Sequence, residues 1–253
     1  MSAPDAATPQ RWTGGPVTDR ATCVLAPNPG PMTLEGTNTW LLGAPGSPAA
    51  VVVDPGEDDP AHRAAIERAL AGRVVALVVA THHHHDHVGG LDAFLAEHPA
   101  PVARRPGRHH AAGLVLDVLS TPGHTADSVS VVLRTGELLT GDTLLGRGST
   151  VLAADGDLGR YLASLRTLLD LAGGTSVLLP GHGPARTDVR AAIAAQLAHR
   201  LDRLEQVRAA VAAGARDVDA VVLAVHGPLE GTLARAAALS VRAQLAHLGL
   251  ELP

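Results

Sequence analysis

The sequence has few features that would suit it to a membrane or to an oxidising compartment. A single cysteine, Cys23, excludes an internal disulfide framework. No apolar run reaches the roughly 18 residues that a membrane-spanning helix needs. The first 16 residues are rich in Pro and Ala and lack the basic and apolar regions of a secretory signal. We therefore expect a cytoplasmic protein with no membrane partner.

Aromatic residues are also scarce, and lysine is absent. The aromatics are Trp12, Trp40, Phe94 and Tyr161, and all 20 basic residues are arginine. Hydrophobic residues make up 46% of the chain, charged residues make up 18%, and the net charge is −5. Proteins that bind single-stranded nucleic acid usually combine a positive groove with exposed aromatic rings. The composition instead predicts a globular protein whose core is filled by Ala, Val and Leu.

The most informative segment reads Thr-His-His-His-His-Asp-His, from Thr81 to His87, directly after the apolar run 74–80. Imidazole and carboxylate groups are common metal ligands, so this density of them predicts a metal site. By itself, such a tract could also be a loose metal-sequestering segment. In an extended chain alternate side chains point the same way, so His82 and His84 share one side. We read His83 and His85 as non-ligands.

Three later positions make a defined site the better interpretation. His124, Asp142 and His182 each follow an apolar run by one or two residues and lie in a glycine-rich turn. Such turns let the backbone bend so that a side chain can point inward. We therefore expect these three residues to join the histidine-rich segment.

Together these motifs resemble the metallo-β-lactamase superfamily, whose THxHxDH signature is matched by His82, His84, Asp86 and His87. The resemblance implies two metal ions. His82, His84 and His124 would hold the first, Asp86, His87 and His182 the second, and Asp142 would bridge them. Zinc suits nitrogen and oxygen ligands best, although manganese or iron could occupy such a site.

A two-metal centre would explain how the protein could hydrolyse a substrate without a nucleophilic side chain. Cys23 lies far from the cluster in the sequence, and no Gly-x-Ser-x-Gly motif occurs. Zinc lowers the pKa of a bound water to about 7. We predict a hydrolase whose metal-bound hydroxide attacks an ester, a thioester or a phosphodiester, with Asp86 and Asp142 as the catalytic carboxylates. A small-molecule acyl or phosphate ester is the expected substrate.

Several residues are candidates for supporting roles. Asp54 ends an apolar run and could accept a proton from a ligating imidazole, as the resemblance also implies, or could simply form a turn. Thr81 and Thr125 could bond to ligands or cap turns. A basic group could bind a substrate phosphate or could be a solvated loop; it comprises Arg104, Arg105, Arg108, His109 and His110.

Alternating strands and helices predict an α/β fold in two parts. Strands are expected at 37–42, 50–53, 74–79, 115–119, 128–133, 137–140 and 176–179, and helices at 60–71, 91–97, 158–171, 189–213, 217–225 and 232–248. The resemblance implies an αββα four-layer sandwich. We expect residues 1–187 to form this catalytic domain and residues 188–253 to form a small C-terminal helical domain that is winged-helix-like.

Longer stretches around Asn28–Trp40, His124, Asp142 and His182 resemble the β-lactamase-like protein 2 group. That group includes an animal endoribonuclease of single-stranded RNA, thioesterases and hydrolases of unknown substrate, so RNA is an alternative substrate. The tail from 190 to 253 carries seven Arg and six acidic residues, a net of +1, which is weak for a nucleic-acid module. The histidine-rich string also resembles glyoxalase II, but the C-terminal domain of those enzymes has no match here. A non-catalytic metal-binding or regulatory role is a further alternative.

Overall fold

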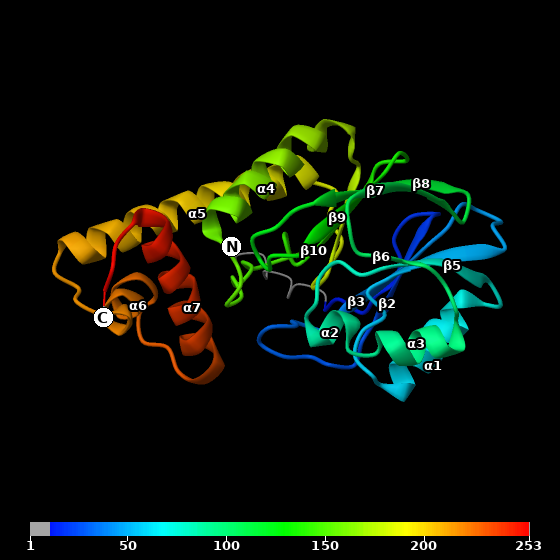
Figure 1. The fold of residues 1–253 in the computed structure, drawn as a ribbon, viewed down its shortest axis with the longest axis horizontal. Helices are drawn as coiled ribbons and strands as arrows, with labels where there is room; N and C mark the ends of the chain where they lie inside the picture. Colours follow the sequence, from blue (N-terminus) through cyan, green and yellow to red (C-terminus); the bar gives the residue numbers. More distant parts are fainter. Residues whose placement is uncertain (1–10, 253) are drawn as a thin grey trace, which may run out of the picture.

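The computed structural model describes residues 11–252, in which two β-sheets are stacked between helices (Figure 1). Part of the N-terminal stretch in which we expect no secretory signal, residues 1–10, lies outside the described residues. The helices pack on the outer faces of both sheets. This arrangement is the αββα sandwich that the resemblance implies, and the predicted fold class is confirmed.

The first sheet has six strands in the order β1-β2-β3-β4-β5-β6. Its strands are β1 (Gly15–Pro16), β2 (Ala21–Leu25), β3 (Asn38–Leu42), β4 (Ala49–Val53), β5 (Val74–Val79) and β6 (Val102–Ala103). Strands β4, β5 and β6 are mutually parallel, so their carboxyl ends meet at one edge of the sheet. This edge carries the histidine-rich segment, which directly follows β5.

The second sheet has five strands in the order β11-β10-β9-β8-β7. Its strands are β7 (Gly107–Ala111), β8 (Leu114–Ser120), β9 (Val129–Leu133), β10 (Glu137–Gly141) and β11 (Val177–Pro180). Strand β9 runs antiparallel to both β8 and β10, while β11 is parallel to β10. Strands β8, β10 and β11 therefore run in one direction, and their carboxyl ends also share an edge.

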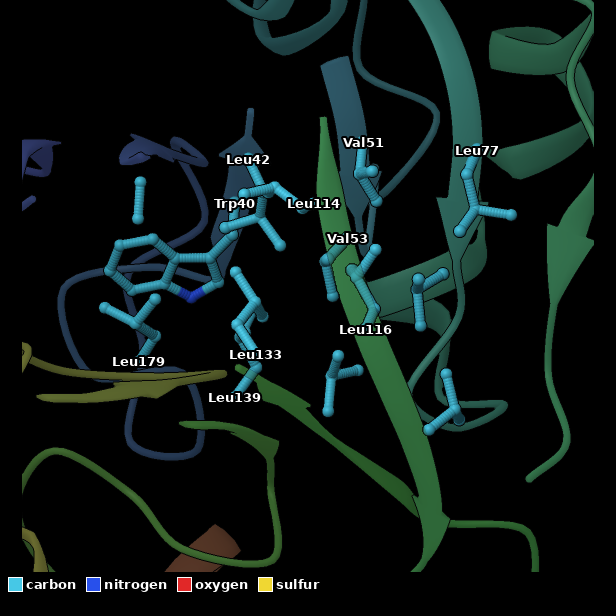
Figure 2. Close-up of a cluster of buried hydrophobic side chains, with 14 of the residues drawn as sticks. Trp40, Leu42, Val51, Val53, Leu77, Leu114, Leu116, Leu133, Leu139 and Leu179 are labelled. Carbon is cyan, nitrogen blue, oxygen red and sulfur yellow. The ribbon is translucent and has the colours of Figure 1, made fainter. Parts of the chain in front are cut away.

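The two sheets enclose an apolar core (Figure 2). Because side chains alternate along a strand, Val51 and Val53 of β4 face this core while Ala50 and Val52 face the helices behind it. Trp40 is the largest side chain in the core, and its indole Nε1 donates to the carbonyl oxygen of Pro180 at 2.9 Å. This hydrogen bond joins the two sheets close to the edge where the predicted ligands lie.

Helices cover both outer faces (Figure 1). Helices α1 (Pro60–Leu70) and α3 (Leu91–Glu97) lie against the first sheet, and α4 (Leu158–Leu171) and α5 (Val189–Ala212) lie against the second. The carboxylate of Asp59 accepts from the backbone N–H of His62, and Pro60 is the first residue of α1. Asp59 is therefore the N-cap of α1. A single turn, α2 (His85–Val88), contains the last three residues of the histidine-rich segment, and a 3₁₀ turn, Ala172–Gly174, follows α4.

The C-terminal region consists of α5, α6 (Val218–His226) and α7 (Gly231–Leu248). These helices share a small apolar core around Val207, Val221 and Val241. The helical prediction is confirmed. Within residues 188–252 there is no strand that could form a wing. The likeness to a winged helix stays a prediction. The boundary between residues 187 and 188 also stays a prediction. None of the helices in residues 11–252 combines the length and the apolar character of a transmembrane segment.

Residues 107–111 differ from expectation, because they form strand β7 instead of a loop. The segment Gly-Arg-His-His-Ala has no apolar alternation, but it pairs in register with β8. A two-residue turn joins the two strands, and both of its residues have positive φ, 51° at Ala112 and 74° at Gly113. This turn geometry is typical of a tight β-hairpin. Residues 107–111 are therefore extended because they pair with β8, and not because of an apolar pattern.

Candidate metal centre

The predicted ligands converge where the carboxyl ends of the two sheets meet. The histidine-rich segment follows β5, while His124 follows β8, Asp142 follows β10 and His182 follows β11. The backbone N–H of Val129 donates to the carbonyl oxygen of Thr81 at 2.8 Å and joins the two sheets at this point. Residues up to 100 positions apart in the sequence thus form one cluster.

Three histidines form the first half of the cluster. His84 Nδ1 lies 3.1 Å from His82 Nε2 and 3.0 Å from His124 Nε2. These three nitrogen atoms lie close enough together to hold one metal ion. His82 and His124 are buried, whereas His84 is half-buried on the solvent side.

The second half combines a carboxylate with two histidines. Asp86 Oδ2 lies 3.3 Å from His87 Nε2 and 3.2 Å from His182 Nε2. The two imidazole Nε2 atoms are 3.3 Å apart. These residues form another group that could hold a metal ion.

Asp142 lies between the two halves. Its Oδ1 is 3.5 Å from His87 Nε2, and its Oδ2 is 3.7 Å from His124 Nε2 and 3.3 Å from His182 Nε2. One carboxylate therefore contacts residues of both groups, which is the position required of a bridging ligand.

The donor set fits metal ions in spacing and in chemistry. Ligand atoms at about 2.1 Å from a tetrahedral zinc lie about 3.4 Å from one another, and the separations above span 3.0–3.7 Å. In addition, Asp142 Oδ1 is buried and has no hydrogen-bond partner among the described residues. A buried carboxylate oxygen without a partner is costly, and coordination of a cation would remove that cost.

Asp54 orients His87 from behind. Its Oδ2 lies 2.8 Å from His87 Nδ1 and accepts from Thr81 Oγ1 at 2.6 Å, while its Oδ1 accepts from the backbone N–H of Thr81 at 2.8 Å. Asp54 has a φ of 52°, which is uncommon for a residue other than glycine. The structure thus brings Asp54 and Thr81 together beside His87, and their supporting role stays a prediction.

In His82, His124 and His182, an oxygen atom lies close to the ring nitrogen Nδ1. His82 Nδ1 is 3.0 Å from Thr81 Oγ1, whose own proton goes to Asp54, so His82 Nδ1–H is the donor. His124 Nδ1 is 2.6 Å from the carbonyl oxygen of Val151, and His182 Nδ1 is 3.3 Å from that of Gly36. These contacts leave Nε2 of each ring free to bind a metal ion.

Glycines are required where the ligand turns pass one another. A Cβ added to Gly181, which precedes His182, would lie 2.4 Å from Asp142 Oδ1. A Cβ added to Gly141, whose φ is 47°, would lie 2.6 Å from Thr81 Oγ1. The Pro-Gly-His and Gly-Asp sequences therefore reflect close approach of the ligand turns.

The two halves differ in protonation. Burial lowers the pKa values of His82, His84 and His124, so these imidazoles are neutral and ready to bind a metal. Burial also acts to lower the pKa of His182, but the negative charge of Asp142 outweighs it and raises the value to about 9. The pKa of His87 is likewise raised by Asp142 and Asp54 against the effect of its burial. Cations entering the second half would displace protons from these rings.

The carboxylates show the opposite shifts. Burial acts to raise the pKa of Asp142, but the charges of His182 and His87 lower it well below its usual range. Burial opposes the shift at Asp86 too, and hydrogen bonds from His182 and His87 outweigh it and lower that pKa. Both carboxylates are therefore ionised, as metal coordination requires.

The two remaining histidines of the tract point outward. His83 and His85 are both exposed, and His83 Nδ1 lies 2.9 Å from Asp127 Oδ1. Within residues 11–252, neither belongs to a group that could hold a metal, and their assignment as non-ligands stays a prediction. Thr125, in contrast, does not bond to a ligand. Its hydroxyl donates to Asp127 and lies 2.7 Å from Ser128 Oγ, so it holds the turn after His124.

The basic group between the ligand motifs is dispersed. Arg108 lies on β7 and forms two hydrogen bonds with Asp117 on β8, and His109 lies beside it on the same strand. Arg104 and Arg105 are exposed in the segment between β6 and β7. In the described part of the chain no hydrogen bond joins these four residues to the predicted ligands, and their role as substrate contacts stays a prediction.

Two polar residues near the predicted ligands, Thr37 and Asn28, were not identified as site residues from the sequence. Thr37 Oγ1 donates to Asp86 Oδ2 at 3.1 Å. Asn28 in turn bonds to Thr37 and to Glu57. Both lie in the Asn28–Trp40 stretch, which resemblance alone had singled out, because a polar residue in a loop carries no pattern that reveals its partner.

Comparison with known proteins agrees with this geometry. Residues 32–117 match the family model described as the metallo-beta-lactamase superfamily. A beta-lactamase-like protein 2 homolog from Caenorhabditis elegans is 34% identical over 215 residues, which cover 76% of this chain and 70% of that protein. An atrochrysone carboxyl ACP thioesterase from Aspergillus chevalieri is 34% identical over 236 residues, covering 83% of this chain and 74% of that protein.

A solved structure shows the same fold. A metallo-beta-lactamase family protein from Thermus thermophilus superposes with a TM-score of 0.73 at 25% identity, covering 92% of this chain and 94% of that chain. The family model matches the part of the chain that contains the histidine-rich segment, and the relatives extend the match over most of its length. The chain belongs to the metallo-β-lactamase superfamily.

Proposed function

We propose that this protein is a hydrolase with a two-metal centre and that it cleaves acyl thioesters. The observation that carries the proposal is the position of Asp142, whose carboxylate contacts both three-residue groups. A relative that is named as a thioesterase and matches most of the chain favours a thioester over the other ester classes. The remaining residues of the cluster are the proposed ligands and stay as assigned from the sequence.

Metal ions held by this cluster would polarise the substrate and lower the pKa of a coordinated water to about 7. The chain itself sets the direction of approach. His82, His87 and His182 are buried, whereas His84 and Asp86 reach partly into solvent, so a substrate would arrive on their side. Thr37 holds the Asp86 carboxylate and Asp54 holds the His87 ring, so both groups are fixed before a substrate arrives.

RNA is the less favoured substrate. Trp40, Phe94 and Tyr161 are fully buried, and the indole N–H of Trp12 is used in a hydrogen bond to Asn38. Across residues 11–252, no aromatic ring is therefore fully exposed as a platform on which bases could stack. This observation agrees with the net charge of −5.

The test combines metal analysis with two substrates. Purified protein should contain zinc, manganese or iron, and should hydrolyse an acyl-coenzyme A faster than it cleaves a single-stranded RNA oligomer. Asp142→Ala should lower thioester turnover by more than about 100-fold, the upper effect of changing a residue that only supports a ligand. Asp170→Ala is the matched control, because Asp170 is an exposed carboxylate on α4.

Two results would count against the proposal. Unchanged turnover in Asp142→Ala would remove the bridging role. Metal-dependent RNA cleavage without thioester hydrolysis would assign the site to a nuclease instead.

A further inference from the structure

Figure 1 shows the C-terminal helices beside the catalytic region. A second polar cluster lies in this part of the molecule, where a cavity of about 360 Å³ is lined by the segment Ser149–Val151 and by residues of α5 and α7. This volume falls in the range of small-ligand sites. None of the proposed metal ligands lines it.

The cavity gathers basic side chains without an acid. His199, Arg200 and Arg203 of α5 and His226 at the end of α6 line it, and no Asp or Glu of the described residues does. The tail has nearly balanced charges in its sequence, but its fold brings these four groups to one place. Arg200 is only 4% exposed.

Several polar atoms in the cavity are buried and unpaired. Arg200 Nε, Arg203 Nε, His226 Nε2 and Gln244 Oε1 have no hydrogen-bond partner among the described residues. They are four of the seven such side-chain atoms in that part of the chain. Buried polar groups are nearly always hydrogen-bonded, so the two unpaired arginine N–H donors indicate a missing acceptor.

Both guanidinium groups are held in place by contacts that leave Nε free. Arg200 donates through Nη2 to the carbonyl oxygen of Thr150, and its guanidinium carbon lies 5.0 Å from the centre of the Tyr161 ring. Arg203 donates through Nη1 to the carbonyl oxygen of Val225 at 2.8 Å and to Gln206. A fixed guanidinium loses little conformational entropy when it binds an anion.

The charges repel one another in the absence of an anion. Burial lowers the pKa of His226, and the neighbouring Arg203 and His199 lower it further. The pKa of His199 is lowered by burial and then by Arg200 and Arg203. Arg200 is buried, so an anion in the cavity would offset the cost of burying its charge.

We propose that this cavity is a binding site for a phosphate group. Phosphate offers several acceptor oxygens and negative charge to the Nε–H groups of Arg200 and Arg203, and guanidinium groups match it well. His226 Nε2 can add a further donor, and Gln244 Oε1 can accept from a protonated phosphate oxygen. The proposal does not depend on the thioesterase activity, because it rests only on the cavity and its unpaired groups.

The segment that lines the cavity also contacts the metal centre. Thr150 Oγ1 donates to the backbone carbonyl of Asp142 at 2.8 Å, and the carbonyl oxygen of Val151 is bound by His124 Nδ1. The phosphate site and the proposed metal site therefore share a wall. The phosphate could be carried by the arm of a substrate or arrive as the free ion.

The test measures binding of inorganic phosphate to the metal-loaded protein by calorimetry. Arg203→Gln and His226→Gln should each weaken binding by about tenfold or more, the usual effect of losing a charge-assisted hydrogen bond. Arg208→Gln is the matched control, because Arg208 lies on the same helix but is exposed and paired with Glu205. Asp142→Ala should retain binding, because Thr150 contacts only its backbone.

Equal binding by the wild type, Arg203→Gln and His226→Gln would overturn the proposal. Loss of binding in Asp142→Ala would overturn it too, because the phosphate would then lie on the metal ions. Unfolding curves of each variant show whether the fold is intact. If Arg203→Gln does not fold, His226→Gln alone tests the phosphate site.

Two thioesters distinguish the source of the phosphate. If the substrate carries it, Arg203→Gln should raise the KM for an acyl-phosphopantetheine and leave the KM for the same acyl-pantetheine unchanged. If free phosphate is the ligand, both KM values should stay unchanged while inorganic phosphate binding is lost. Phosphate binding without hydrolysis of either thioester would refute the proposed activity but not this site.

Discussion

Val53 and Asp54 are neighbours in the chain and are equally buried, yet they belong to two different kinds of interior. Val53 is part of the apolar layer between the sheets, where contact with similar side chains stabilises the fold. Asp54 lies one residue further, at the carboxyl edge, where polar groups gather at a cost in stability. The same strands therefore provide stability in their middle and chemistry at their ends.

The first prediction concerns a substitution that disrupts the apolar layer between the sheets. Trp40→Ala should lower the free energy of unfolding by about 3–5 kcal/mol, because it leaves a large cavity between the sheets. It also removes the indole hydrogen bond to Pro180, two residues before His182. Urea unfolding measures the loss, and Trp40→Phe, which keeps part of the volume, should lose less. A loss below about 1 kcal/mol would mean that the sheets do not depend on this contact.

The second prediction concerns acid sensitivity at the edge. His62 Nε2 bonds to Thr39 Oγ1, which donates to the carbonyl oxygen of Asp54, and burial lowers the pKa of His62 to about 4. The unfolded chain takes up this proton near pH 6.5 and the folded protein only near pH 4, so stability falls as the pH drops between these values. The loss between about pH 7 and about pH 5 should be about 2 kcal/mol.

Urea unfolding at these two pH values tests this against His62→Gln. The variant keeps the other titrating groups, so the difference in pH dependence isolates His62. If both proteins lose the same stability, His62 is not held neutral in the folded state.

The third prediction concerns the support of the ligands. Asp54→Asn should weaken metal binding by about 10- to 100-fold, because it removes the charge that faces His87 Nδ1. Asparagine tolerates positive φ, so the backbone at this position is retained. Competition with a chromogenic chelator measures the affinity. Asp170→Asn, on the exposed face of α4, should leave the metal affinity unchanged. Equal losses in both variants would contradict a supporting role for Asp54.

Sequence reasoning succeeded where chemistry is encoded locally. Strand β5 followed from the apolar run 74–80. The expectation that His82 and His84 would lie together and His83 would point away followed from the alternation of an extended chain. Strand β7 was missed, because its sequence has no strand pattern and its conformation comes from pairing with β8.

Sequence reasoning was less successful in identifying the hydrogen-bond partners of candidate site residues. Thr125 was expected to bond to a ligand or cap a turn, and only the structure shows that its hydroxyl meets Asp127 and Ser128. Arg108 was a candidate for phosphate contact, but it is paired with Asp117 across a hairpin. In both cases the residue type indicated a polar interaction, but the sequence did not identify the partner residue.

The sequence by itself determined the composition of the proposed metal site, because ligand identity, local spacing and the glycines of the turns are properties of short segments. Only the tertiary structure decided that four basic groups of the C-terminal helices would share one cavity without an acid. Their meeting depends on how α5, α6 and α7 pack against one another and against Ser149–Val151. That packing arises from apolar contacts between segments distant in sequence. The local pattern of charged residues therefore does not predict that these four groups meet.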